Sequence, residues 1–101
     1  MFKTAVLVSG GGTNLQALID YQNSHADCPY KIDVVISSTK NAYALERAKT
    51  AGIDCVVKSP FSVMGKEAAQ KALREEKNAA VSDAILEECK FRGIDGIVLA
   101  G

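Results

Sequence analysis

Four short apolar runs rich in β-branched residues recur along the chain, and segments with helical periodicity separate them. Within each run the apolar residues follow one another instead of alternating with polar residues, which is typical of strands in a parallel sheet. The runs are TAVLVS (residues 4–9), IDVVIS (32–37), IDCVVK (53–58) and IDGIVLA (94–100). This pattern predicts an α/β protein with four parallel strands, each buried on both faces.

The first two connecting segments predict one helix each. The first helix begins at Thr13, because Thr13 and Gln16 have the spacing of a capping box. The second helix spans residues 42–51, and Gly52 follows it as a C-terminal stop. The apolar stripe of the first helix consists of Leu15, Leu18 and Ile19.

The third connecting segment, residues 66–92, is the longest. It predicts either one long helix or two, because Asn78 and Ser82 both favour helix caps over helix interiors. Gly93 ends the segment. Its apolar face consists of Leu73, Val81, Ile85 and Cys89, and glutamates and lysines fill the other face.

These elements follow one another in the order β-α-β-α-β-α-β, and crossovers between parallel strands are almost always right-handed. We therefore expect a Rossmann-like open parallel sheet in a single domain of residues 1–101. The last run ends one residue before Gly101, and no helical pattern follows it. The sheet is therefore expected to be incomplete at its carboxyl-terminal end, and to self-associate or to pair with a missing carboxyl-terminal half.

The composition excludes several classes of partner. Twelve basic and twelve acidic residues give no net charge, so no long-range field attracts nucleic acid or an anionic membrane. No apolar stretch has the length of a membrane span, and no signal-peptide pattern precedes the first run. We therefore expect a cytoplasmic protein that binds neither nucleic acid nor membranes and that captures any anionic ligand locally.

The candidate reactive residues do not form a catalytic or metal-binding pattern. Cys28, Cys55 and Cys89 are 27 and 34 residues apart, which fits neither a CxxC pair nor a zinc site and predicts reduced thiols. His25 lies in the turn-like stretch NSHADCPY and is expected to be a solvated loop residue. The solvent-exposed face of the third segment is expected to contain Glu75, Glu76, Glu87 and Glu88. The sequence therefore predicts no metal site and no catalytic residue.

The stretch VLVSGGGTNLQAL, residues 6–18, places three glycines between a strand and a helix. Such a turn directs backbone N–H groups and the positive end of the helix dipole at one point, which suits a phosphate. Glycine leaves room for the anion and permits a positive φ. Thr13 and Asn14 add polar side chains at the mouth of this cradle.

Two common phosphate-binding motifs do not match this turn. A dinucleotide fingerprint requires a third glycine where Leu15 stands, and a nucleoside-triphosphate P-loop requires a lysine that is missing nearby. A small phosphate monoester, such as a sugar phosphate, fits the remaining pattern. The alternative is a tight strand-to-helix turn without a ligand.

The stretch SGGGTNLQALI resembles the opening of the phosphoribosylglycinamide formyltransferases (glycinamide ribonucleotide formyltransferases), whose pattern is a strand followed by SGxG-Ser/Thr-Asn-Leu-Gln. VVISSTKNAYALERAKTAGI is similar to the second strand and helix of that family, and IDGIVLAG to its fourth strand. The three matches occur in order and correspond to about the first half of a typical member. Two departures are Ser38, where the family usually has asparagine, and Ala44, where it usually has glycine.

The resemblance implies a reaction, in which a formyl group passes from 10-formyltetrahydrofolate to the amine of glycinamide ribonucleotide during purine biosynthesis. It also implies that Gly12, Thr13 and Asn14 bind the ribose phosphate of that substrate. A basic residue at the start of the family's third helix contacts the folate co-substrate; Arg74 and Lys66 both fit that position, and Arg74 requires the smaller insertion. The family's catalytic asparagine, histidine and aspartate lie beyond residue 101, so this chain alone is expected to be inactive.

Two other functions fit the same residues. The chain could be a stand-alone sugar-phosphate or nucleotide-binding module, or a structural partner that uses its uncovered sheet for assembly. An Asn-x-His motif soon after residue 101 of a longer reading frame would favour the enzyme, and a natural stop codon would favour the alternatives.

Overall fold

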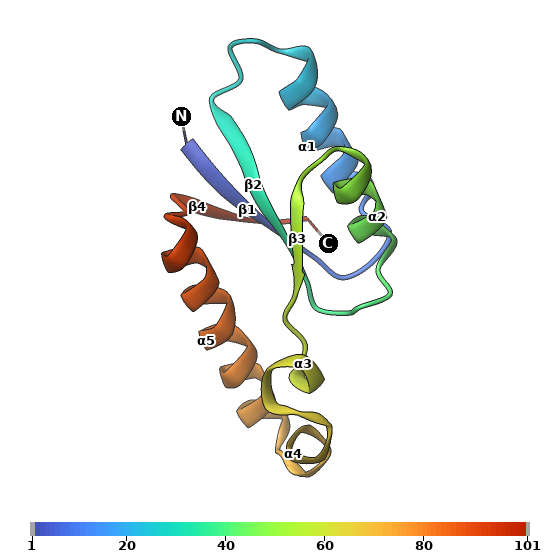
Figure 1. Ribbon diagram of the computed structural model, residues 1–101, viewed down its shortest axis with the longest axis vertical. Helices are drawn as coiled ribbons and strands as arrows, with labels where there is room; N and C mark the ends of the chain where they lie inside the picture. The colour runs from blue at the N-terminus through green and yellow to red at the C-terminus, as the bar shows by residue number, and fades with distance from the viewer. Residues whose placement is uncertain (1, 101) are drawn as a thin grey trace.

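A single sheet of four strands, in the order β3-β2-β1-β4, occupies the centre of the computed structural model, which describes residues 2–100 (Figure 1). Every neighbouring pair of strands is parallel. The Rossmann-like open parallel sheet predicted from the sequence is therefore confirmed, with strand ends within two residues of the predicted ones. The strands are β1 (Phe2–Val8), β2 (Tyr30–Ser37), β3 (Asp54–Val57) and β4 (Gly96–Leu99).

Helices cover both faces of this sheet. Helices α1 (Thr13–Ser24) and α2 (Tyr43–Thr50) pack on one face, and α5 (Arg74–Arg92) packs on the other. The central strands β1 and β2 are thus buried on both faces, as predicted. The core on the α1 side contains Val6, Val8, Leu15, Ile19, Ile32, Val35, Ala44, Ala48 and Ala100. The core on the α5 side contains Ala5, Val34, Ile36 and Cys89, with Leu7, Val56, Ile85 and Ile94 packed against it.

Strand β2 contains one extra residue where it pairs with β1. Thr4 of β1 is opposite Ile32, but the next residue, Ala5, is opposite Val34. Asp33 is therefore a β-bulge, which shifts the register between the two strands. Its carboxylate oxygen Oδ2 lies 3.4 Å from Nη1 of Arg92 on α5.

The crossover from β3 to β4 contains a short helix that the sequence pattern did not predict, α3 (Pro60–Met64). Ser59 caps it, because the Ser59 side chain accepts a hydrogen bond from the Ser62 amide while Ser62 Oγ accepts one from the Ser59 amide. Pro60 occupies the first position of the helix, where its missing N–H costs nothing.

Residues 66–92 form two helices, α4 (Lys66–Lys71) and α5. The break lies at Ala72 and Leu73, whose backbones are extended. Asn78 and Ser82, the predicted interruption points, both lie inside α5. The prediction that Leu73 belongs to the apolar face is also wrong: its side chain is 69% exposed, and its amide donates to Oε1 of Glu76 at 2.8 Å.

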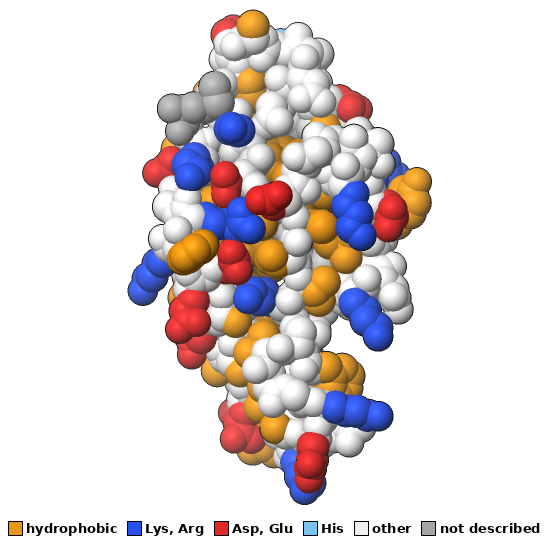
Figure 2. All heavy atoms as spheres, viewed as in Figure 1, with side chains coloured by type: hydrophobic (Ala, Val, Ile, Leu, Met, Phe, Trp, Pro, Cys, Tyr) orange, Lys and Arg blue, Asp and Glu red, His pale blue; other side chains and the backbone are white. Residues whose placement is uncertain are grey.

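Together, α3, α4 and the first turns of α5 form an arm that projects beyond the carboxyl ends of the strands (Figure 1). The arm makes the molecule long, with principal extents of 48 × 25 × 18 Å. Within the arm, Gly65 links α3 to α4 with a φ of 91°. Acidic and basic side chains are interspersed over the face shown in Figure 2, in keeping with the balanced composition.

Ionic contacts hold the last turn of α5 to the sheet. Arg92 donates from Nε to Oε2 of Glu88 at 2.8 Å, and from Nη1 to Oδ2 of Asp54 at 3.2 Å. Lys58 Nζ lies 3.6 Å from the other oxygen of Glu88. The Glu88 side chain is only 18% exposed, so the expectation that it lies on a solvent-exposed helix face is wrong.

Strand β4 lies at one edge of the sheet and is far less buried than the apolar sequence predicts. It pairs with β1 on one side only. Ile97, Val98 and Leu99 are 43%, 38% and 79% exposed. Within residues 2–100 no helix follows β4.

Candidate functional site

The glycine loop, residues 9–12, joins the carboxyl end of β1 to the first turn of α1. Gly12 precedes the helix with φ 79° and ψ 27°, a left-handed conformation that glycine adopts at no steric cost. Its carbonyl accepts the first helical hydrogen bond, from the Gln16 amide at 2.8 Å. The loop thus lies at the carboxyl edge of the sheet, the usual position of ligand sites in open α/β folds.

Close packing against α2 also requires a glycine at position 12, and the sequence did not indicate this packing. A Cβ atom on Gly12 would lie 2.6 Å from the Cβ of Ala44 and 2.8 Å from its Cα. By contrast, a Cβ on Gly10 or Gly11 would have no heavy atom of residues 2–100 within 4 Å. Open space in the loop therefore lies beside Gly10 and Gly11, while Gly12 is packed against α2.

The predicted capping box of α1 does not form. Gly12 rather than Thr13 is the N-cap residue, and no side chain in the described part of the chain caps the helix. Gln16 donates instead to Oδ1 of Asp20 at 2.9 Å. Thr13 and Asn14 are exposed in the first turn of α1, where the backbone N–H groups have no partner within the helix.

Helix α2 holds the loop from the side. The Ala44 amide donates to the carbonyl of Gly10 at 3.1 Å, and Nε of Arg47 donates to the carbonyl of Gly11 at 2.7 Å. Arg47 Nη1 also donates to Oε1 of Gln16 at 3.3 Å. Sequence reasoning missed Arg47, because a single arginine in an amphipathic helix carries no signal of a loop contact made 36 residues away.

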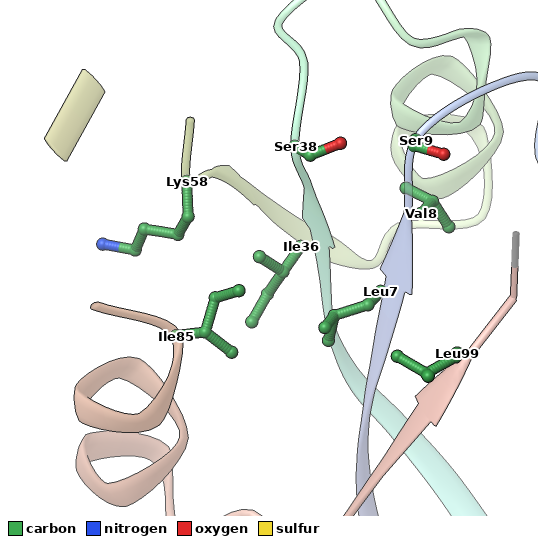
Figure 3. Close-up of a pocket in the computed structure, with 8 residues that line it drawn as sticks. All are labelled: Leu7, Val8, Ser9, Ile36, Ser38, Lys58, Ile85 and Leu99. Atoms are coloured by element: carbon green, nitrogen blue, oxygen red, sulfur yellow. The ribbon is translucent and has the colours of Figure 1, made fainter. Parts of the chain in front are cut away.

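An apolar pocket lies beside the glycine loop, on the α5 face at the carboxyl ends of the strands (Figure 3). Its volume is about 350 Å³. Figure 3 shows the side chains of Leu7, Ile36 and Ile85 pointing toward one another, with Ser38 at the rim. The full lining is Leu7, Val8, Ser9, Ile36, Ser38, Lys58, Ile85 and Leu99.

The two basic residues proposed to meet a co-substrate both lie in the arm. Lys66 is the first residue of α4, and Arg74 is the first residue of α5. Both are exposed, and neither forms an ion pair with any residue in the described range 2–100. Because both begin a helix, their local positions do not distinguish them.

The cysteines and His25 are structural or peripheral. Cys28, Cys55 and Cys89 are unpaired, and burial, followed by the Glu88 carboxylate, raises the pKa of the Cys89 thiol. His25 is exposed, as expected, and stacks on the Tyr21 ring at 3.8 Å. In the part of the chain that is described, no group of three His, Cys, Asp or Glu side chains could hold a metal ion. No helix of that part is long and apolar enough to cross a membrane.

Comparison with known proteins identifies the family. The family model described as formyl transferase matches residues 2–101, nearly the whole chain. The chain belongs to the formyl transferase family. The resemblance seen in the glycine-loop sequence is thereby confirmed over the full length of the chain.

Relatives of this formyl transferase chain include two phosphoribosylglycinamide formyltransferases. The one from Haemophilus influenzae is 42% identical over 103 residues, covering 100% of this chain and 42% of the relative. The one from Dictyostelium discoideum is 44% identical over 105 residues, covering 99% of this chain and 46% of the relative. The chain thus spans less than half the length of these relatives.

Solved structures give the same result for the fold of this formyl transferase chain. Glycinamide ribonucleotide transformylase 1 from Symbiobacterium toebii superposes with a TM-score of 0.80 and 36% identity, covering 100% of this chain and 42% of that one. The corresponding protein from Geobacillus kaustophilus has a TM-score of 0.78 and 31% identity, covering 98% and 46%.

Proposed function

We propose that this chain is the substrate-binding part of a phosphoribosylglycinamide formyltransferase of de novo purine biosynthesis. In the proposed reaction, the amine of glycinamide ribonucleotide attacks the formyl carbon of 10-formyltetrahydrofolate. The bond from that carbon to the folate nitrogen breaks, the amine loses a proton, the folate nitrogen gains one, and tetrahydrofolate leaves. Support comes from the relatives, which are named phosphoribosylglycinamide formyltransferases, and from the glycine loop.

The observation that carries the proposal is the glycine loop at the carboxyl edge of the sheet. Its open side at Gly10 and Gly11 adjoins the first turn of α1, where Thr13 and Asn14 are exposed. Amides and a helix N-terminus that converge in this way favour a phosphate dianion. In the proposal, Gly12, Thr13 and Asn14 bind the phosphate of glycinamide ribonucleotide.

The formyl donor is proposed to bind across the same edge of the sheet. The apolar pocket beside the loop suits a flat ring system, because its walls are mostly leucine, isoleucine and valine. Lys66 or Arg74 in the arm would meet the carboxylates of the folate. The three unpaired cysteines suit a reducing compartment such as the cytoplasm.

Titration calorimetry with a pair of matched ligands tests the phosphate assignment. Glycinamide ribonucleotide should bind the purified chain, and glycinamide riboside, which lacks the phosphate, should bind at least tenfold more weakly. Gly11→Val should weaken nucleotide binding without unfolding the chain, because its side chain enters open space. Equal affinity for both ligands would contradict the proposed site.

We also propose that the chain alone does not catalyse formyl transfer. General-base and oxyanion groups contribute orders of magnitude to such a rate, and the family resemblance puts them in residues beyond 101. Incubation with both substrates should give no formylated product above the background rate. Turnover of about 1 per second or faster would be typical of a complete enzyme and would refute this.

A further inference from the structure

Arg47 connects three parts of the candidate site. Its Nε atom donates to the Gly11 carbonyl at 2.7 Å, and its Nη1 atom donates to Oε1 of Gln16 at 3.3 Å. The guanidinium also lies over the ring of Tyr43, 5.0 Å from the ring centroid. One forked side chain therefore joins the glycine loop to the second turn of α1 and is itself held by an aromatic ring on α2.

These contacts determine which way the loop amides point. In a trans peptide, the C=O of one residue and the N–H of the next point in opposite directions, and residues 2–100 contain no cis peptide bond. The carbonyls of Gly10 and Gly11 both accept hydrogen bonds from α2. The N–H groups of Gly11 and Gly12 therefore point away from α2, and neither donates to a backbone carbonyl within the described residues.

The peptide between Gly11 and Gly12 needs such a restraint more than other peptides do. Both of its residues are glycines, so it can rotate about its neighbouring bonds with little steric cost. If it turned over, its carbonyl oxygen would replace the N–H on the open side of the loop and would repel an anion. The bond from Arg47 to the Gly11 carbonyl opposes this rotation, and a charged donor makes it one of the stronger kinds of hydrogen bond.

We propose that Arg47 is a positioning residue for phosphate binding: its forked guanidinium donates to both the Gly11 carbonyl and the side-chain oxygen Oε1 of Gln16, and so keeps the Gly12 N–H facing the phosphate. This inference rests on the proposed function, because it assigns the group that orients the same loop. It requires no contact between Arg47 and the phosphate itself.

Three variants of the chain separate positioning from charge. Arg47→Met keeps most of the side-chain length and removes both donors. Arg47→Lys keeps the charge but replaces the fork by one ammonium, which cannot reproduce the two fixed N–H directions. Lys49→Met is the matched control, because it removes one positive charge from the same helix. The Lys49 side chain is 62% exposed, and among the described residues its ionic partner is Glu46 alone.

The readouts are calorimetric affinity for glycinamide ribonucleotide and the amide NMR signals of Gly11 and Gly12. We expect Arg47→Met to bind at least tenfold more weakly than wild type, Arg47→Lys about threefold more weakly, and Lys49→Met within twofold of wild type. We also expect the Gly12 amide signal to broaden or double in ligand-free Arg47→Met while signals of the sheet stay unchanged. A purely structural role would not produce that local change.

The outcomes distinguish this inference from the proposed function. If wild type and folded Arg47→Met bind the nucleotide equally, or if Lys49→Met loses as much affinity as Arg47→Met, the positioning role is overturned and the phosphate site stands. If Arg47→Met does not fold, Arg47→Lys provides the test. Nucleotide binding by Arg47→Lys with wild-type affinity would show that the forked guanidinium is not needed and would overturn the positioning role. If the wild-type chain shows no affinity for the nucleotide, both the phosphate site and the role of Arg47 are overturned.

Discussion

Gly12 and Ala44 are in such close contact that a methyl group on Gly12 would lie 2.6 Å from the Cβ of Ala44. Real Cβ contacts are essentially never this short. The contact joins the loop before α1 to the first turn of α2. It gives the third glycine of the sequence motif a packing role in addition to its left-handed backbone.

The first prediction follows from that contact. Gly12→Ala should lower the free energy of unfolding by about 2–4 kcal/mol, because a positive φ and a steric clash add together. In the double variant Gly12→Ala, Ala44→Gly the 2.6 Å contact is removed, but the 2.8 Å approach to the Cα of residue 44 and the cost of the positive φ remain, so part of the stability should return. Urea unfolding followed by circular dichroism measures both changes. Independent, additive effects of the two substitutions would show that the contact is unimportant.

A second prediction concerns Arg92, whose side chain is 20% exposed and contacts three carboxylates. Arg92→Met should lower the free energy of unfolding by about 1–3 kcal/mol, because Glu88 and Asp33 would remain partly buried without this partner. The matched control is Lys71→Met, which breaks an exposed ion pair with Glu67 and should cost less than about 0.5 kcal/mol. Similar losses in the two variants, measured by urea unfolding, would contradict the structural role of Arg92.

Cys89 provides a third prediction, on the pH dependence of stability. Burial and the neighbouring Glu88 carboxylate raise the pKa of its thiol above the ordinary value of 9.0. As the pH rises through 9, the unfolded chain therefore loses this proton before the folded chain does, and stability falls. The free energy of unfolding should decrease between pH 8 and pH 9.5 by a larger amount in wild type than in Cys89→Ala. Parallel pH profiles of the two proteins would rule out this contribution.

The fourth prediction concerns the uncovered strand β4. Leaving about 200 Å² of apolar surface in water forfeits roughly 5 kcal/mol, so the isolated chain should self-associate at micromolar concentration. Leu99→Lys, on the edge strand, should shift the chain toward monomer in sedimentation equilibrium, because a charge on an edge strand opposes pairing. Leu73→Lys, at a similarly exposed leucine in the arm, should not. A wild-type chain that is monomeric with a sharp, concentration-independent thermal transition would contradict the prediction.

The sheet could be predicted from the sequence because its signals are local. The consecutive apolar residues within each run indicate a buried strand, and the alternation of runs with helical segments implies parallel strands. The position of the glycine loop also follows from local signals, since the three glycines stand between a strand and a helix. For the same reason, the family could be recognised from a short stretch of residues.

The rest of the site depends on contacts between distant residues. The hydrogen bond from Arg47 to Gly11 and the packing of Gly12 on Ala44 arise only when α2 is placed beside the loop. Gln16 has the spacing of a capping residue, but its side chain bonds Asp20 and Arg47 instead. The break at Ala72 and Leu73 carries no glycine or proline, so nothing in the local sequence marks it.

The extra residue in β2 has a consequence for how the two layers of the protein are tied together. Tyr30 and Ile32, before Asp33, pack toward α1, whereas Val34 and Ile36, after it, pack toward α5, although all four are even-numbered. The two halves of the strand are therefore out of phase with each other. Ile32 and Val34 are opposite the consecutive residues Thr4 and Ala5 of β1, so the bulge takes up the extra residue. If Asp33 instead paired in the regular ladder, every residue after it would move to the opposite face, so this bulge decides which helix layer the second half of β2 supports.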